Sequence, residues 1–222
     1  MEFVAYPSRG ALATGLAAVI AGQLREALAK GAATLSVPGG TTPGPVFDTL
    51  SAADLDWPRV AVLLNDERWV DDTNPRSNTR LLRERLFVNF AAKARLVPMY
   101  AATATPEEAL DQLADGILPH LPITVLLLGM GSDMHTASLF PGADKLAQAL
   151  ATNAPVLMAL RADAAGEPRI TLSAPVLKHA RHIHILITGP DKRAALARAK
   201  HLPPLEAPVR VVLDQATVHW AE

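Results

Sequence analysis

Apolar runs alternate along this chain with segments in which apolar residues recur every three or four positions. The apolar runs predict buried strands at residues 34–37, 59–65, 123–128, 156–160, 182–188 and 209–213. The periodic segments predict amphipathic helices at residues 11–29, 75–87, 107–118 and 191–200, with a further helix from about Pro45. Such an alternation predicts an α/β fold with a mostly parallel sheet and helices on both faces.

The chain is uniform in composition along its length. It has no internal repeat and no low-complexity linker, so we expect a single domain over residues 1–222. Half of its residues are apolar and 19% are charged, which is enough apolar material for a sizeable core.

Charge and cysteine content exclude several classes of function. The 21 basic residues nearly balance the 22 acidic ones, which argues against a nucleic-acid or anionic-membrane partner but not against one small anionic ligand. The chain has no cysteine, which excludes disulfides, thiolate catalysis and cysteine-ligated metals. The N-terminal sequence lacks the pattern of a targeting segment, and the longest apolar stretch, residues 12–20, falls short of the roughly 20 residues that span a bilayer. We therefore expect a cytoplasmic protein.

The densest chemical signal follows the strand expected at residues 123–128. Gly129 and Gly131 are followed by Asp133 and His135. Ligands of open α/β sheets bind beyond the carboxyl ends of strands, and an Asp beside a His can orient the imidazole as a general base. Alternatively, Asp133 caps a helix that begins near His135, and both roles are compatible. The segment lacks the third glycine of a dinucleotide-binding motif, and the chain has no Gly-x-Ser-x-Gly motif of a serine hydrolase.

A glycine- and threonine-rich loop follows the strand expected at residues 34–37. Its backbone amides and hydroxyls predict a phosphate-binding loop formed by Gly39, Gly40, Thr41 and Thr42. Pro45 stands where a P-loop has its lysine, so a nucleoside triphosphate is not the expected ligand. An ordinary Gly/Pro turn is the alternative.

Four charged residues follow or flank other expected elements. Asp66 and Arg68 end a strand, where they either enter the same crevice or form a solvated strand end with an Asp72–Arg76 pair nearby. Lys192 lies in the first turn of a helix, where a bound phosphate would relieve its repulsion from the helix dipole. For Arg169 and Lys192 the alternative is an exposed charge.

Three histidines lie close together at positions 179, 182 and 184. They lack a His-Glu-x-x-His motif and a nearby set of carboxylates, so we expect no metal site there.

Four segments, in this order, resemble the 6-phosphogluconolactonases of the pentose phosphate pathway. They are Ser36 to Pro43, Asn65 to Arg68 with Ser77-Asn78, Leu128 to Gly142, and Arg169 to Ser173 with Thr188 to Lys192. The resemblance covers about residues 3–215 and implies a Rossmann-like α/β domain. It implies an enzyme that hydrolyses 6-phospho-D-glucono-1,5-lactone without a metal or organic cofactor. We expect a monomer or weak homo-oligomer.

The resemblance also assigns roles to individual residues. His135 matches the general base that activates water, and Asp133 matches the residue that orients the site around it. Asp66 and Arg68 match residues that line the pocket, with Arg68 steadying the substrate or the oxyanion. The phosphate site is matched by Gly40, Thr41, Thr42, Arg169 and Lys192. His135 and Lys192 must therefore open onto one cavity.

The chain departs from the family pattern at two positions. The family usually has Gly where this chain has Met134, and Pro where it has Ser132. Because Met is strained at positive φ, either the backbone is ordinary at Met134 or the pocket is altered.

Two rival functions remain open at the level of the sequence. An amino-sugar-phosphate deaminase or isomerase shares the glycine loop, but it carries an acidic residue after the His that is missing here. A non-catalytic sugar-phosphate sensor is the other alternative, although no DNA-binding module is present.

Overall fold

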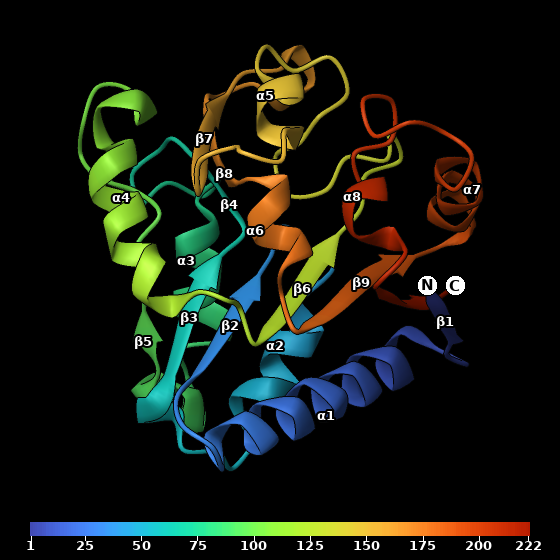
Figure 1. The fold of residues 1–222 in the computed structure, drawn as a ribbon. Coiled ribbons are helices and arrows are strands. Elements are labelled where there is room, and N and C mark those ends of the chain that lie inside the picture. Colours follow the sequence, from blue (N-terminus) through green and yellow to red (C-terminus); the bar gives the residue numbers. More distant parts are fainter.

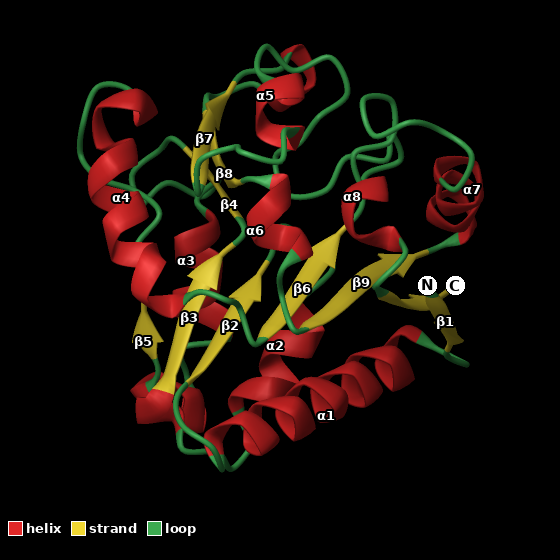
Figure 2. Ribbon diagram, viewed as in Figure 1, coloured by secondary structure: helices red, strands yellow, loops and turns green.

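The computed structural model describes residues 1–222, apart from the side chain of Ala164, and shows two sheets of unequal size (Figures 1 and 2). The strands of the larger sheet are β1 (Glu2–Ala5), β2 (Ala33–Val37), β3 (Val60–Leu64), β5 (Arg95–Leu96), β6 (Val125–Gly129), β9 (His182–Thr188) and β10 (Thr217–Ala221). They run in the order β1-β10-β9-β6-β2-β3-β5, and all neighbours are parallel. The smaller sheet is antiparallel and consists of β4 (Asp66–Arg68), β8 (Arg169–Leu172) and β7 (Leu157–Leu160).

Helices cover both faces of the larger sheet. They are α1 (Arg9–Leu28), α2 (Gly44–Ser51), α3 (Asn78–Arg85), α4 (Leu110–Ile117), α5 (Leu146–Leu150), α6 (Ala174–Lys178), α7 (Pro190–Ala199) and α8 (Arg210–Leu213). Short 3₁₀ turns are η1 (Trp57–Arg59), η2 (Asn89–Lys93), η3 (Pro106–Ala109), η4 (Leu118–His120) and η5 (Asp163–Ala165). Right-handed crossovers between parallel strands put α1 and α2 on one face and α4, α6 and α8 on the other, as Figure 1 shows. Every residue of β2 and β3 is consequently buried.

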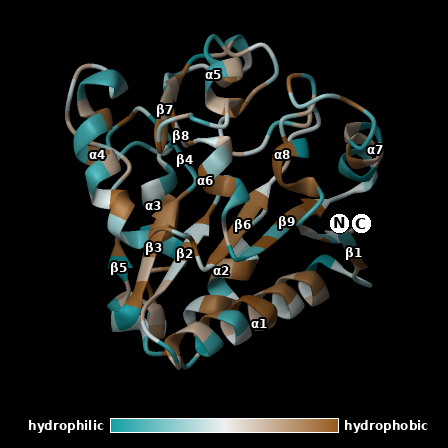
Figure 3. Cartoon of the chain, viewed as in Figure 1, coloured by the Kyte–Doolittle hydropathy of each residue, from teal (hydrophilic) through white to brown (hydrophobic). Residues whose placement is uncertain are grey.

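Helix α1 is long and apolar enough, by length and composition, to span a membrane. However, its apolar side, which includes Leu12, Leu16, Ile20 and Leu24, is buried in the protein core. Figure 3 shows hydrophobic residues along β3 and β6 as well. The apolar residues of α1 therefore act as core residues of this fold.

Most of the elements expected from the hydrophobic pattern are confirmed. The α/β class, the parallel sheet and the long helices agree with the prediction, and the strand over residues 182–188 is reproduced as β9. The strand expected at residues 209–213 is wrong, because this segment forms the short helix α8 and the last strand, β10, follows it. The run at residues 156–160 does form a strand, β7, but in the small antiparallel sheet.

The direction of the chain connections reverses between β2 and β6. From β2 the chain proceeds to β3 on one side, whereas from β6 it proceeds to β9 on the other, although β2 and β6 are hydrogen-bonded neighbours. A crevice forms at such a switch point, beyond the carboxyl ends of the two strands. Two loops lie beside this crevice, residues 38–43 after β2 and residues 130–140 after β6.

Candidate active site

A cavity of about 350 Å³ opens at this switch point. Its walls come from the loop after β2, the loop after β6, the small sheet and the first turn of α7. The lining residues that sequence reasoning singled out are Gly39, Gly40, Thr42, Asp66, Arg68, His135, Arg169 and Lys192. The expectation that His135 and Lys192 share one cavity is therefore confirmed.

The loop after β6 holds an Asp–His pair. His135 Nδ1 lies 2.6 Å from Asp133 Oδ1, and the same carboxylate oxygen accepts the backbone N–H of His135 at 3.2 Å. When Nδ1 carries the proton that this contact requires, Nε2 has a free lone pair. Burial would raise the pKa of Asp133, but its hydrogen bond to His135 and the attraction of that ring outweigh burial and lower the pKa below its usual range. Asp133 itself does not line the cavity, so it acts on the cavity through His135.

No helix begins at His135 in the described chain, where turns run up to α5. The alternative that Asp133 caps a helix is therefore wrong, although its oxygen does bind a backbone amide. The close approach requires Gly131, since a Cβ there would lie 2.2 Å from both Asp133 Oδ1 and His135 Nδ1. The imidazole also packs against the Phe140 ring, with centroids 4.2 Å apart.

Met134 has a φ of +66°. The backbone there is the left-handed one that glycine adopts readily, so the alternative of an ordinary backbone at Met134 is wrong, and a methionine occupies a conformation that favours glycine. The Met134 amide donates to the Gly131 carbonyl at 3.0 Å, and the Gly131 amide donates to the His135 carbonyl at 2.9 Å. These bonds, together with partial burial of the Met134 side chain against the core, hold the strained residue in place.

The loop after β2 is shaped by two glycines. Gly40 has a φ of +84°, and a Cβ on Gly39 would lie 1.8 Å from Asn78 Oδ1. Asn78, the first residue of α3, thus fills the space beneath the loop, and its Nδ2 donates to the Asp66 carbonyl at 3.0 Å. Thr42 lines the cavity, whereas Thr41 is exposed and does not.

The small sheet brings two arginines face to face. Arg68 on β4 is directly opposite Arg169 on β8, and both line the cavity. Like charges in directly opposed positions repel each other, so an anion between them would be stabilising. Asp66, two residues along β4, lies 3.8 Å from Arg169 and is the one carboxylate lining the cavity in the described structure.

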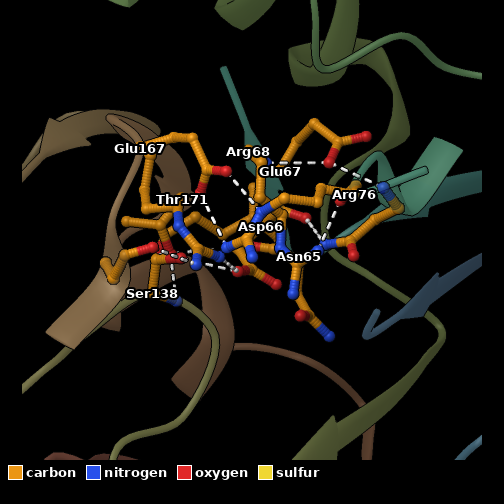
Figure 4. A network of polar contacts seen from close by, with 12 residues as sticks. Asn65, Asp66, Glu67, Arg68, Arg76, Ser138, Glu167 and Thr171 are labelled. Atoms are coloured by element: carbon orange, nitrogen blue, oxygen red, sulfur yellow. Dashed lines mark hydrogen bonds and ion pairs between the residues drawn. The ribbon is translucent and has the colours of Figure 1, made fainter. Parts of the chain in front are cut away.

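Hydrogen bonds hold the cluster of Asp66, Arg68, Arg169 and Thr171 in place, and two of these bonds come from the loop after β6 (Figure 4). The Ser138 hydroxyl donates to Asp66 Oδ2 at 2.5 Å, and the Ser138 amide donates to Thr171 Oγ1 at 3.2 Å. Arg169 donates to the Ala165 carbonyl at 2.9 Å, and Arg68 donates to the Arg76 carbonyl. The polar contacts thus tie the loop that carries His135 to both strands that carry the arginines.

Arg169 is buried, which excludes the alternative of an exposed loop charge. Burial lowers its pKa from the ordinary arginine value, and Asp66 partly opposes that shift. The Nε atoms of Arg68 and Arg169 are buried and have no hydrogen-bond partner in the described structure. The alternative Asp72–Arg76 pair is also wrong, because Arg76 pairs with Glu167 instead.

Glu67 was not singled out by the sequence, yet it is the most heavily bonded side chain near the site. It is fully buried and accepts five hydrogen bonds, from the amides of Arg68, Asn78 and Thr79 and from the hydroxyls of Ser77 and Thr79. Burial raises its pKa, and the amide hydrogen bonds oppose this. Glu67 therefore attaches the start of α3, including Asn78, to β4. Its signal in the sequence was an acidic residue inside an otherwise buried strand end.

Lys192 lies in the first turn of α7, as expected. Burial lowers its pKa, and the Asp133 carboxylate partly opposes this shift. The ammonium therefore lies within electrostatic reach of the Asp–His pair while lining the same cavity.

Two other histidines, His184 and His219, belong to a buried chain of hydrogen bonds away from the cavity. His184 Nδ1 lies 3.0 Å from His219 Nε2, and His184 Nε2 lies 2.8 Å from Gln23 Oε1. The Tyr6 hydroxyl is 2.9 Å from His219 Nδ1 and completes the chain. Among the described residues, no group of three or more His, Cys, Asp or Glu side chains has the arrangement of a metal site.

Comparison with known proteins points to one family. The family described as glucosamine-6-phosphate isomerases/6-phosphogluconolactonase has a sequence profile that matches residues 7–220. The 6-phosphogluconolactonase of Rhizobium meliloti is 40% identical over 97% of each chain, and that of Mesorhizobium japonicum is 43% identical over 98% of this chain and 94% of its own. The crystal structure of a 6-phosphogluconolactonase from Shewanella baltica superposes with a TM-score of 0.97 at 36% identity, over 100% of this chain and 98% of that one.

Proposed function

Because the chain belongs to the glucosamine-6-phosphate isomerase/6-phosphogluconolactonase family, we propose that it hydrolyses 6-phospho-D-glucono-1,5-lactone to 6-phospho-D-gluconate. The observation that carries the proposal is one cavity lined by His135, Lys192 and a facing pair of arginines. It combines a base for water with positive charge for a phosphate and for a developing oxyanion.

The chemistry requires few groups, since a δ-lactone is an activated ester that water can attack without a covalent enzyme intermediate. In the proposed mechanism His135 Nε2 takes a proton from water as its oxygen attacks the C1 carbonyl. The imidazolium that results is stabilised by Asp133, 2.6 Å from Nδ1. The bond between C1 and the ring oxygen then breaks, and the ring oxygen takes the proton from the His135 imidazolium, which opens the lactone to the acid. General-base catalysis of this kind contributes typically about 10²–10⁴-fold in rate.

Arg68 is the proposed partner of the carbonyl oxygen as negative charge develops on it. Its buried Nε without a partner and its position opposite Arg169 support this role, because both features leave a donor and a positive charge available to an anion. Asp66, held by Ser138 and close to Arg169, is proposed to orient this pair of arginines.

The phosphate group is proposed to bind the loop residues Gly39, Gly40 and Thr42 together with Lys192 and Arg169, and Thr41 is left out because it does not line the cavity. The positive φ of Gly40 and the missing side chain of Gly39 support a backbone that approaches an anion closely. Binding energy from this remote group would hold C1 against the attacking water. The proposed reaction uses neither a metal nor an organic cofactor, and we propose a cytoplasmic monomer or weak homo-oligomer.

The family also includes isomerases, so the rival reaction is ring opening and deamination of an amino-sugar phosphate. That chemistry requires an acidic residue shortly after the His, and Thr136 to Pro141 contains none. The names of the relatives at 40% and 43% identity favour the lactonase.

The test is a stopped assay with freshly prepared 6-phosphogluconolactone, corrected for spontaneous hydrolysis, beside an assay for ammonia release from glucosamine 6-phosphate. We expect saturable lactone hydrolysis and no ammonia. Ammonia release without lactone hydrolysis would support the deaminase. Tight binding of 6-phosphogluconate with neither activity would support a sensor.

A further inference from the structure

A second cavity opens at the opposite edge of the central sheet, where the strands begin. Its volume is about 410 Å³, which exceeds the 350 Å³ of the first cavity. Its walls come from the residues at or just before the amino ends of β2, β3, β5, β6 and β9. The lining residues that matter here are Thr34, Arg59, Arg95, His120, Thr124 and Arg181.

The charged residues that line this amino-edge cavity are all basic. Arg59, Arg95 and Arg181 line it, and the described lining contains no Asp or Glu. Arg59 has an exposed partner, Asp56, at 3.4 Å outside the lining. Neither Arg95 nor Arg181 takes part in any ion pair found in the described structure. In a chain with a net charge of −1, such a cluster is a local excess of positive charge.

The positive charge around the cavity acts on His120, which also lines it. Burial lowers its pKa, and the positive charge of Arg95 lowers it further. The side chain is thus close enough to Arg95 to feel its charge, and an anion between the two groups would oppose the repulsion.

The register of the sheet sets the spacing of the arginines. Arg95 begins β5 and pairs with Ala61 of β3, so it is adjacent to Arg59, which immediately precedes β3. Arg181 immediately precedes β9, which is three strands from β3 in the sheet order, or roughly 14 Å at about 4.8 Å per strand. The cavity therefore has one end with two arginines and another with a single arginine.

Apolar groups separate the two ends. Leu121 and Pro122, from the loop that precedes β6, contribute to the wall together with Pro58 and Pro119. Such surfaces suit a short carbon skeleton rather than a bare ion, because they offer contact area without hydrogen bonds.

We propose that the amino-edge cavity binds a small metabolite with two phosphate groups, one held by Arg59 and Arg95 and the other by Arg181. The guanidinium groups match phosphate oxygens in a bidentate manner. This site lies across the sheet from the cavity of His135 and does not depend on the proposed lactonase activity.

The test is calorimetric titration with 1,6-hexanediol bisphosphate and with inorganic phosphate. All proteins carry Lys192→Ala, which removes a cation from the first cavity. We expect the bisphosphate to bind more tightly than phosphate, and Arg95→Gln/Arg181→Gln to weaken its binding by about tenfold or more. Arg181→Gln alone should reduce bisphosphate affinity to about that of inorganic phosphate.

The matched control is Arg83→Gln/Lys200→Gln, which removes two exposed cations outside both cavities. It should change bisphosphate affinity by less than about twofold, because well-separated surface charges are screened. Thermal melts check that each variant folds. Equal weakening by the control pair, unchanged binding in Arg95→Gln/Arg181→Gln, or no bisphosphate binding to the parent would each overturn the proposal.

Discussion

The two sheets of this protein bury different kinds of side chain. The strands β3 and β6 of the central sheet bury aliphatic residues, whereas β4 and β8 of the small sheet bury Asp66, Glu67, Arg169 and Thr171. Buried charges are costly unless they are paired and hydrogen-bonded. Here Glu67 and Asp66 are bonded to α3 and to the loop after β6, and Arg169 is bonded to the Ala165 carbonyl and lies 3.8 Å from Asp66. The central sheet therefore contributes chiefly to stability, whereas the small sheet places charged side chains, including two arginines, where a ligand is expected.

The largest expected effect belongs to His135, which lies outside both sheets. His135→Ala should lower kcat for lactone hydrolysis by about 10²–10⁴-fold and leave the melting temperature nearly unchanged, since the imidazole is partly exposed. His201→Ala, at an exposed position after α7, is the control and should keep full activity. Wild-type turnover by His135→Ala would remove the base from the proposed mechanism.

The central sheet is probed by Leu126→Ala. Leu126 is fully buried in β6, so the cavity left behind should lower the free energy of unfolding by about 2–5 kcal/mol, measured by urea denaturation. The KM of the folded protein should stay unchanged. A raised KM with little loss of stability would contradict the claim that the central sheet contributes chiefly to stability and the small sheet to the site.

Lys192 tests the proposed phosphate site. Lys192→Ala should raise KM by about 10- to 100-fold, corresponding to the loss of a charged hydrogen bond, with a smaller change in kcat. Lys200→Ala, at the exposed end of the same helix, should leave both constants unchanged. An unaltered KM in Lys192→Ala would exclude this residue from substrate binding.

The small sheet is probed by Glu67→Gln. An amide cannot accept from all five donors, so the free energy of unfolding should fall by about 1–3 kcal/mol. KM should rise as well, because Asn78 loses its anchor beneath the phosphate loop. Glu84→Gln, at an exposed position of α3 where it pairs with Arg80, should cost less than about 1 kcal/mol and leave KM unchanged. Equal effects of the two substitutions would argue against a positioning role.

The smallest effect concerns the histidine chain between α1, β9 and β10. Burial, followed by the charges of neighbouring histidines, lowers the pKa of His184 to about 3, and burial lowers that of His219 to about 4. The unfolded chain binds these protons near pH 6.5, so stability is present above that pH and should fall by roughly 1–2 kcal/mol between pH 8 and pH 6. His219→Gln should reduce this dependence. If the melting temperature depends on pH in the same way in the wild type and in His219→Gln, His219 is not a source of this pH dependence.

Sequence patterns predicted the central sheet better than the small one, for a physical reason. Continuous runs such as the one that forms β9 are long enough to distinguish a buried strand from other structure. The segments of β4 and β8 are three and four residues long and contain charges, so no hydrophobic period marks them. At residues 209–213 the apolar pattern predicted a strand where none forms, because a short apolar run is compatible with both a strand and a buried helical turn.

The candidate site was predictable where its residues follow a strand. His135 and the glycine loop follow β6 and β2, and the rule for open α/β sheets brings these ends together. Arg68 and Arg169 lie opposite each other because β4 and β8 pair in antiparallel orientation. These segments are about a hundred residues apart, so local sequence patterns do not encode their pairing. Asn78 and Glu67 act through backbone contacts that only the folded chain reveals.

The pairing of β1 with β10 has a consequence for synthesis on the ribosome. Glu2 and Thr217, which are in register, are also hydrogen-bonded through their side chains and lie 215 positions apart. Strand β1 is synthesised before the other strands of its sheet, and it therefore lacks its neighbour until β10 has been translated. Its docking closes the sheet as a late event, and a nascent chain stalled before residue 217 should expose that edge to chaperones and proteases.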